Sequence, residues 1–220
     1  MRIVKHLMAA FSFGLLALSP AAFAAETKGL GYYAMTDPQP TDSGKKVEVI
    51  EFFGYACPHC FGFDPVLAAW VKKQGDQIVF KRIPANFRPE WALHARMYYA
   101  LESMGKNEEM HAKIFNAMHG ERQPLNTEDA IINFVAKHGI DKQKFTDAFG
   151  SFSVQAKVKR LAQMQANYKI ENVPTIIIDG RYVTAPHLAA DLVGRDRSEP
   201  ELQQAALKIM DDLVAKSKKK

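Results

Sequence analysis

Cysteine is scarce in this sequence, since only Cys57 and Cys60 occur among its 220 residues. That count excludes a small fold held together by several disulfides, and it places all thiol chemistry in one short segment. An excess of one charge sign is also lacking: 29 Lys and Arg residues against 24 Asp and Glu residues leave a net charge of +5, too small to indicate a nucleic-acid partner. The content of 47% hydrophobic and 24% charged residues excludes wholesale disorder, and the length allows one large or two small domains.

Long apolar runs are nearly absent as well, and the clearest one lies at the N-terminus. It extends from Leu7 to Leu18, follows Arg2 and Lys5, and precedes small residues that end at Ala24, which is the layout of a cleaved secretory signal. A helix of about twelve residues covers roughly 18 Å, short of the ~30 Å hydrocarbon core of a membrane. We therefore expect residues 1–24 to be a signal peptide and the remaining chain to be soluble in an oxidising compartment.

A strand, a helix and a second strand are predicted next. Val47 to Phe53 is rich in β-branched and aromatic residues, which predicts a strand covered on both faces. Residues 57–73 predict a helix with Pro58 at its first position, where a missing N–H costs nothing. Residues 77–83 predict the second strand. This order implies a right-handed crossover and a parallel strand pair.

The remaining chain is mostly helical. Residues 89–165 predict five helices in succession, with Met and aromatic residues on their inner faces as core. Strand signals return at residues 175–178 and 181–184, separated by Asp179 and Gly180, a pair typical of a tight hairpin turn. A final helix carries Leu202, Ala206 and Ile209 on one side. The fold class is therefore α/β.

The segment Cys57-Pro58-His59-Cys60 carries the chemistry. Two thiols three positions apart at a helix start can close a small disulfide, and the first thiol faces the positive end of the helix. A helix N-terminus and a cationic neighbour such as His59 both lower a thiol pKa, and the thiolate is the reactive form. A stable Cys57 thiolate makes the disulfide easy to pass on to a substrate.

Zinc binding is the alternative for such a thiol pair. A zinc site needs about four ligands at suitable spacing. The sequence has no second pair of cysteines, and His111 and His119, the closest remaining histidine pair, lack a convincing partner set. Redox chemistry is therefore favoured over metal binding.

These residues resemble a known family. The stretch from Glu51 through Cys57-Pro58-His59-Cys60, together with Val173-Pro174-Thr175, is similar to the DsbA family of periplasmic thiol oxidants. The resemblance covers essentially the whole chain after the signal. It implies a thioredoxin fold with a central mixed sheet, interrupted by an inserted all-helical domain. Residues 25–88 and 166–220 would form the thioredoxin-like domain, and residues 89–165 the helical insertion.

The resemblance also implies an activity. A DsbA-like protein donates its disulfide to reduced, unfolded exported proteins in the periplasm and is then reoxidised by a membrane quinone reductase of the DsbB type. The redox centre is the Cys57–Cys60 disulfide itself, so we expect no separate cofactor, no metal and no nucleic-acid partner. We expect a monomer.

Site residues follow from the same resemblance. Cys57 corresponds to the exposed nucleophile and Cys60 to the buried resolving thiol, while His59, beside Pro58 in the intervening dipeptide, tunes the potential. Val173 and Pro174 correspond to the substrate-binding segment, with Pro174 in the cis form.

Glu51 stands in the middle of an apolar strand, where a carboxylate is either buried with a raised pKa or paired with a cation such as Lys81 or Arg82. The family analogue is a buried acid that manages protons for the inner cysteine. A structural ion pair is the alternative.

Two other functions remain open at this point. A disulfide isomerase or reductase could have the same fold, although the related isomerases carry a dimerisation domain, for which about twenty residues between signal and first strand leave no room. A redox-silent peptide-binding or chaperone domain would use the cysteines structurally.

Overall fold

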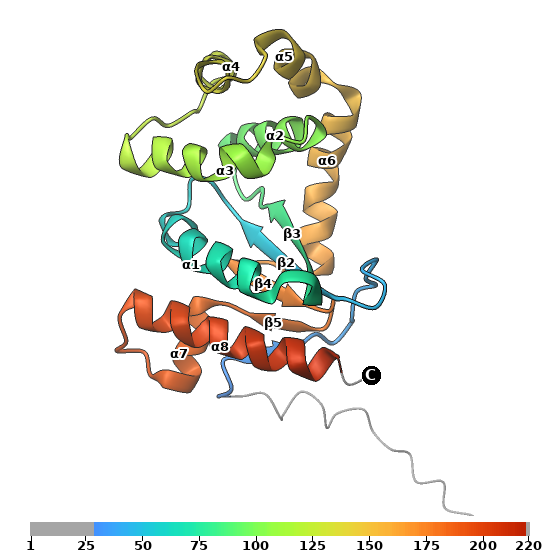
Figure 1. The fold of residues 1–220 in the computed structure, drawn as a ribbon, viewed down its shortest axis with the longest axis vertical. Coiled ribbons are helices and arrows are strands. Elements are labelled where there is room, and N and C mark those ends of the chain that lie inside the picture. The colour runs from blue at the N-terminus through green and yellow to red at the C-terminus, as the bar shows by residue number, and fades with distance from the viewer. Residues whose placement is uncertain (1–28, 219–220) are drawn as a thin grey trace, which may run out of the picture.

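A mixed sheet forms the centre of the molecule (Figure 1). Within residues 29–218, which the computed structural model describes, five strands pair in the order β1-β5-β4-β2-β3. The strands are β1 (Tyr32–Ala34), β2 (Val47–Phe53), β3 (Ile78–Pro84), β4 (Thr175–Ile178) and β5 (Tyr182–Thr184). β2 and β3 are parallel, and the other neighbours are antiparallel. The signal peptide expected over residues 1–24 lies outside the described residues.

The first half of the sheet forms as the sequence predicts. β2 is buried at every position, because β3 and β4 flank it and helices cover its faces. It leads into α1 (Pro58–Gln74), a short 3₁₀ helix η2 (Gly75–Gln77) and the parallel strand β3. Pro58 stands at the start of α1 as predicted.

The segment between β3 and β4 is all-helical. It contains α2 (Pro89–Ser103), α3 (Asn107–Phe115), the π-helical turn η3 (Asn116–Gly120), α4 (Glu128–Lys137), α5 (Lys142–Gly150) and α6 (Phe152–Asn167). α4 and α5 lie farthest from the sheet, whereas α6 returns alongside it (Figure 1). One hydrophobic cluster contains Phe53 of β2, Tyr98 of α2 and Phe115 of α3. The helical segment and the sheet therefore share one continuous core.

A second hydrophobic cluster fills the opposite side of the sheet. Its members include Val49 of β2, Ile176 of β4, and Phe63 and Leu67 of α1. Two further helices, α7 (Pro186–Val193) and α8 (Glu199–Ser217), complete this layer (Figure 1). This architecture confirms the thioredoxin fold with a mixed sheet and a helical insertion.

The hairpin turn also matches its prediction. Asp179 and Gly180 both have positive φ, 54° and 62°. The Arg181 N–H donates to the Ile178 carbonyl at 3.0 Å, so Arg181 belongs to the turn and β5 begins one residue later than predicted. No helix within residues 29–218 has both the length and the hydropathy to cross a membrane.

A candidate dithiol site at the start of helix α1

The two cysteines occupy the first turn of α1. Cys57 is the N-cap residue, with extended backbone angles of φ −91° and ψ 116°, and its N–H donates to the Gly54 carbonyl at 3.0 Å. The Cys60 N–H donates to Cys57 Sγ at 3.4 Å. The first sulfur therefore accepts a bond from a backbone amide that the helix leaves without an intrahelical partner.

The Cys57 thiol is less accessible than the exposed nucleophile that the resemblance implies. Cys57 is only 8% exposed, and Cys60 is not exposed at all. Cys57 is covered because the segment before β4 lies against it: its Sγ is 3.5 Å from the carbonyl oxygen of Val173. Cys57 is thus the more accessible sulfur, at the edge of the protein surface.

The two thiols also differ in acidity. Hydrogen bonding from the Cys60 side chain, the backbone amides of Cys60 and His59, and the charge of His59 together lower the pKa of Cys57 to about 6, although burial opposes the shift. Burial, followed by the neighbouring Cys57 and Glu51, raises the pKa of Cys60 well above its usual value. At neutral pH the pair is therefore one thiolate and one thiol.

The Val173–Pro174 peptide bond lies beside this pair and is cis. Pro174 and Val173 also line a cavity of about 270 Å³, together with His59, His187 and Glu199. Seven residues are predicted for the site, and the structure brings six of them together around the first turn of α1. The seventh, Glu51, is buried in β2.

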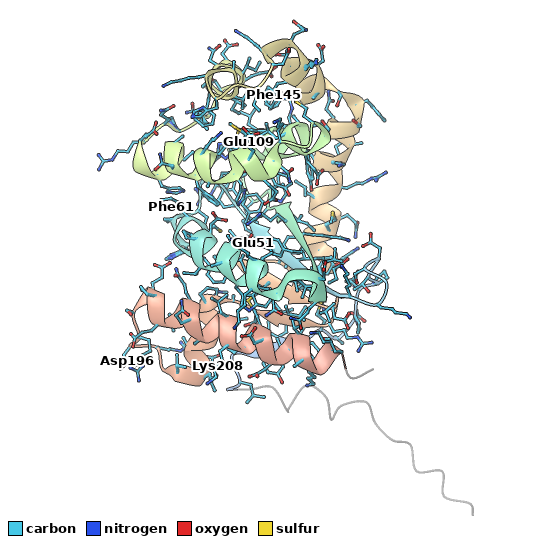
Figure 2. All side chains as sticks on the ribbon, in the orientation of Figure 1. Glu51, Phe61, Glu109, Phe145, Asp196 and Lys208 are labelled. Atoms are coloured by element: carbon cyan, nitrogen blue, oxygen red, sulfur yellow. The ribbon has the colours of Figure 1, made fainter. Side chains whose placement is uncertain are left out.

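Glu51 lies at the centre of the molecule (Figure 2) and is fully buried. Burial raises its pKa to about 7, although Arg82 opposes the shift. Arg82 Nε donates to Glu51 Oε2 at 3.0 Å, whereas Glu51 Oε1 has no hydrogen-bond partner among the described residues. Of the two cations considered from the sequence, Arg82 is the partner, since Lys81 binds Asp42 and Glu48 instead.

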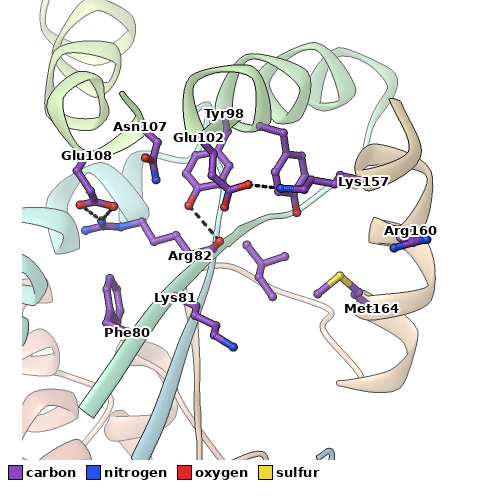
Figure 3. Close-up of a pocket in the computed structure, with 12 residues that line it drawn as sticks. Phe80, Lys81, Arg82, Tyr98, Glu102, Asn107, Glu108, Lys157, Arg160 and Met164 are labelled. Carbon is purple, nitrogen blue, oxygen red and sulfur yellow. Dashed lines mark hydrogen bonds and ion pairs between the residues drawn. The ribbon is translucent and has the colours of Figure 1, made fainter. Parts of the chain in front are cut away.

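Arg82 is the hub of a buried ionic network that sequence reasoning missed. Its guanidinium contacts Glu51 and, at 3.2 Å, Asp64. It also contacts Glu108 at 2.8 Å, and Figure 3 shows this pair. His111 extends the network, because its Nε2 lies 3.2 Å from Asp64 Oδ1. The Glu108 side chain is 70% exposed, so the network connects Glu51 to the protein surface.

The two histidines considered as metal ligands have other contacts. His111 Nδ1 lies 3.0 Å from the hydroxyl of Tyr55, and His119 Nε2 lies 2.8 Å from the carbonyl oxygen of the same tyrosine. His119 also stacks on Phe61, which follows Cys60. Both histidines therefore tie α3 and η3 to the loop before Cys57. In the described part of the chain no group of three side chains is arranged to hold a metal ion.

A larger cavity lies away from the cysteines. It measures about 450 Å³ and is bounded by β3, α2 and α6, with Tyr98, Tyr99 and Arg160 among its lining residues (Figure 3). The Tyr98 hydroxyl donates to the backbone carbonyl of Arg82 at 3.2 Å. Neither cysteine lines this cavity.

Comparisons with known proteins agree with this geometry. Residues 48–203 match the family described as a DSBA-like thioredoxin domain. The thiol:disulfide interchange protein DsbA of Burkholderia cepacia is 44% identical over 185 residues, covering 83% of this chain and 87% of the relative. The crystal structure of Pseudomonas aeruginosa DsbA superposes with a TM-score of 0.76 at 31% identity, covering 85% of this chain and 92% of that one. That of DsbA from Xylella fastidiosa gives 0.74 at 28% identity, over 86% and 96%.

Proposed function

The chain belongs to the DSBA-like thioredoxin domain family and is a thiol:disulfide oxidoreductase, and on that premise we propose that it donates its Cys57–Cys60 disulfide to reduced, unfolded exported proteins in the periplasm. One observation carries the proposal: Cys57 caps α1 with a thiol pKa lowered to about 6, and Cys60 lies behind it with a raised pKa. A stable thiolate in the reduced form makes the disulfide a strong oxidant.

The reaction proceeds in two exchanges. A substrate thiolate attacks Cys57 Sγ, the Cys57–Cys60 bond breaks, and Cys60 leaves with the electron pair and takes up a proton. A second substrate thiolate then attacks the substrate sulfur of the mixed disulfide, and Cys57 leaves as a thiolate. The substrate has lost two electrons and gained a disulfide, and the enzyme holds the dithiol.

The surrounding residues have distinct roles in this scheme. Cys57 is attacked first because Cys60 is fully buried. The Val173 carbonyl oxygen lies 3.5 Å from the attacked sulfur, and Val173 and Pro174, which line the neighbouring cavity, bind the substrate backbone. Pro58 begins α1, and His59 adds positive charge beside the thiolate.

Glu51 is proposed to supply the proton that Cys60 needs on leaving. Its pKa of about 7 keeps a substantial fraction of the carboxyl protonated near neutrality. It is close enough to Cys60 for its charge to raise that thiol's pKa.

Regeneration requires an oxidant, for which we propose a membrane quinone reductase of the DsbB type, with the quinone taking the two electrons. We further propose that the chain is exported by a signal at residues 1–24 and acts as a monomer. We propose that residues 25–88 and 166–220 form the thioredoxin-like domain around the helical insertion 89–165. The change from sheet to helices at residues 84–89 and back at 167–175 supports this division.

The proposal is tested by equilibrating the protein with glutathione and by mixing its oxidised form with a reduced, unfolded secreted protein. We expect the Cys57–Cys60 pair to be more oxidising than glutathione, with loss of substrate thiols matched by gain of enzyme thiols. Cys57→Ala should abolish the transfer. A potential as low as that of a reductase, or full activity of Cys57→Ala, would overturn the proposal.

A further inference from the structure

His59 has a fixed partner on a distant helix. Its Nδ1 atom lies 3.0 Å from Oε1 of Glu199, the first residue of α8, which stands 140 positions later in the chain. Both side chains are on the surface, with 68% and 46% of their area exposed. Exposed ion pairs contribute little to fold stability. The consequence of this contact therefore lies in the charge and orientation of the imidazole beside Cys57.

The packing of two helices places Glu199 there. α1 and α8 approach each other where Gly62 has no side chain: a Cβ at Gly62 would stand 3.3 Å from Gln203 Nε2 and 3.6 Å from Glu199 Oε1. Gln203 is buried, and its amide lies 3.5 Å from the same carboxylate oxygen. A capping box between Ser198 and Glu201 fixes where α8 begins.

We propose that Glu199 is a positioning residue for the dithiol reaction: it orients the His59 ring and gives it an anionic partner, so that an imidazolium stands beside the Cys57 thiolate. The positive charge stabilises the reduced enzyme, in which Cys57 is ionised, and has no thiolate to stabilise in the oxidised enzyme. Glu199 thereby makes the disulfide more oxidising, although it does not touch the reacting sulfur atoms.

The other charges around His59 support this assignment. From α7, His187 lines the same cavity as His59, and its own pKa is lowered by burial. From the loop before α8, Arg197 lines the same cavity, and its guanidinium is paired with Glu201 at 3.3 Å. From the start of α1, Cys57 contributes the thiolate. Glu199 is the acidic residue among those lining this cavity, and its hydrogen bond raises the pKa of His59.

The sign of the effect separates this role from a simple charge effect. Removing a negative charge near Cys57 would by itself make the thiolate more stable and the enzyme more oxidising. Removing Glu199 as the partner of His59 has the opposite effect, because the imidazolium loses its proton at a lower pH. The variant and the wild type should differ most in their redox equilibrium at pH values that lie between their two His59 pKa values.

The test compares Glu199→Gln with Glu201→Gln, which removes the same charge two residues away and leaves a side chain that can still close the capping box. Proton NMR titration of His59 in the reduced full-length mature protein is the first readout. We expect Glu199→Gln to weaken proton binding by His59 about 1.4- to 5-fold, the range for exposed pairs, and Glu201→Gln to leave it nearly unchanged.

The second readout is the equilibrium with glutathione, in which the disulfide and two glutathione thiols give the dithiol and one oxidised glutathione. We expect Glu199→Gln to shift this equilibrium toward the disulfide by about twofold near neutral pH. An unchanged His59 titration, or equal behaviour of the two variants, would overturn the inference. The second readout rests on the proposed function, whereas the first does not. A weakly oxidising wild type combined with a shifted His59 titration would therefore refute the function alone.

Discussion

The Cys57 thiol donates to the carbonyl oxygen of Val173 at 3.5 Å, although 116 residues separate them in the chain. This bond requires the protonated sulfur, because a thiolate has no hydrogen to donate. Ionisation of Cys57 therefore removes the bond to Val173, whereas the Cys60 N–H, which donates to the same sulfur at 3.4 Å, also stabilises the thiolate. The acidity of Cys57 thus decides, with pH, whether the bond to Val173 is made.

The first prediction concerns the stability of the reduced form against pH. The folded pKa of Cys57, about 6, lies below the ordinary thiol value of 9.0. The stabilisation is thus fully present above the unfolded pKa and is lost as pH falls through about 6. As pH rises from about 6 to 9.0, we expect the reduced form to gain roughly 1.4 kcal/mol of stability over the oxidised form per pH unit. Paired denaturation curves from pH 5 to 9 measure this difference, and a flat difference would contradict the lowered pKa.

The second prediction concerns Glu51→Gln. The pKa of Glu51 is raised to about 7 by burial, so its contribution to stability is present below the unfolded value of 4.5 and is lost as pH rises through about 7. We expect the variant to gain stability over the wild type by roughly 1–3 kcal/mol above pH 7. We also expect its turnover to lose a pH dependence centred near 7, because the amide cannot supply a proton to Cys60.

Glu48→Gln is the matched control for this experiment. Glu48 stands on the same strand and is also buried, at 3% exposure, but its cationic partner is Lys81. Its substitution should leave the pH profile of turnover in place. If Glu51→Gln and wild type share one profile, Glu51 has no role in proton transfer and serves only in the ion pair with Arg82.

The sequence alone predicts the part of the site whose residues are neighbours in the chain. Cys57, Pro58, His59 and Cys60 are contiguous, and the order of strand and helix around them is enough to place a thiol at a helix N-terminus. The burial of β2 could also be predicted, since a short apolar run with few breaks is typical of a strand covered on both faces. β1 was missed because three residues are too few to show a period, and α7 because eight residues after a hairpin carry a weak signal.

The other half of the site depends on how helices dock. Asp64 and Glu108 reach Arg82 from α1 and α3, and Glu199 reaches His59 from α8. Periodicity shows which face of a helix is apolar, but not which residue of a neighbouring helix meets a given side chain. One signal was present: Asp64 stands on the buried side of α1, where an acid requires a cation.

The third prediction concerns Arg82→Met. Arg82 is 8% exposed and is the cation that Glu51, Asp64 and Glu108 share. Its loss leaves two buried carboxyl groups without a counter-charge, which costs about 3–5 kcal/mol. The cost should shrink at pH 5, because Glu51, whose pKa is raised to about 7, is then protonated and needs no partner. Urea denaturation at pH 5 and pH 8 measures it, with Arg82→Lys, which keeps the charge, as the control. Equal stability of Arg82→Met and wild type at pH 8 would contradict this account.

The fourth prediction uses the contact between the loop before Cys57 and α2. Trp91 packs so closely on Gly54 that a Cβ there would overlap the indole ring. Gly54 has no positive φ, so the constraint is steric. Gly54→Ala should therefore destabilise the protein by about 1–3 kcal/mol and displace the indole, which intrinsic fluorescence detects. Because the clash involves one partner, Trp91→Ala should remove most of the cost of Gly54→Ala in a double-mutant cycle. If the two costs simply add, the glycine is required for some other reason, and α2 does not set the position of this loop.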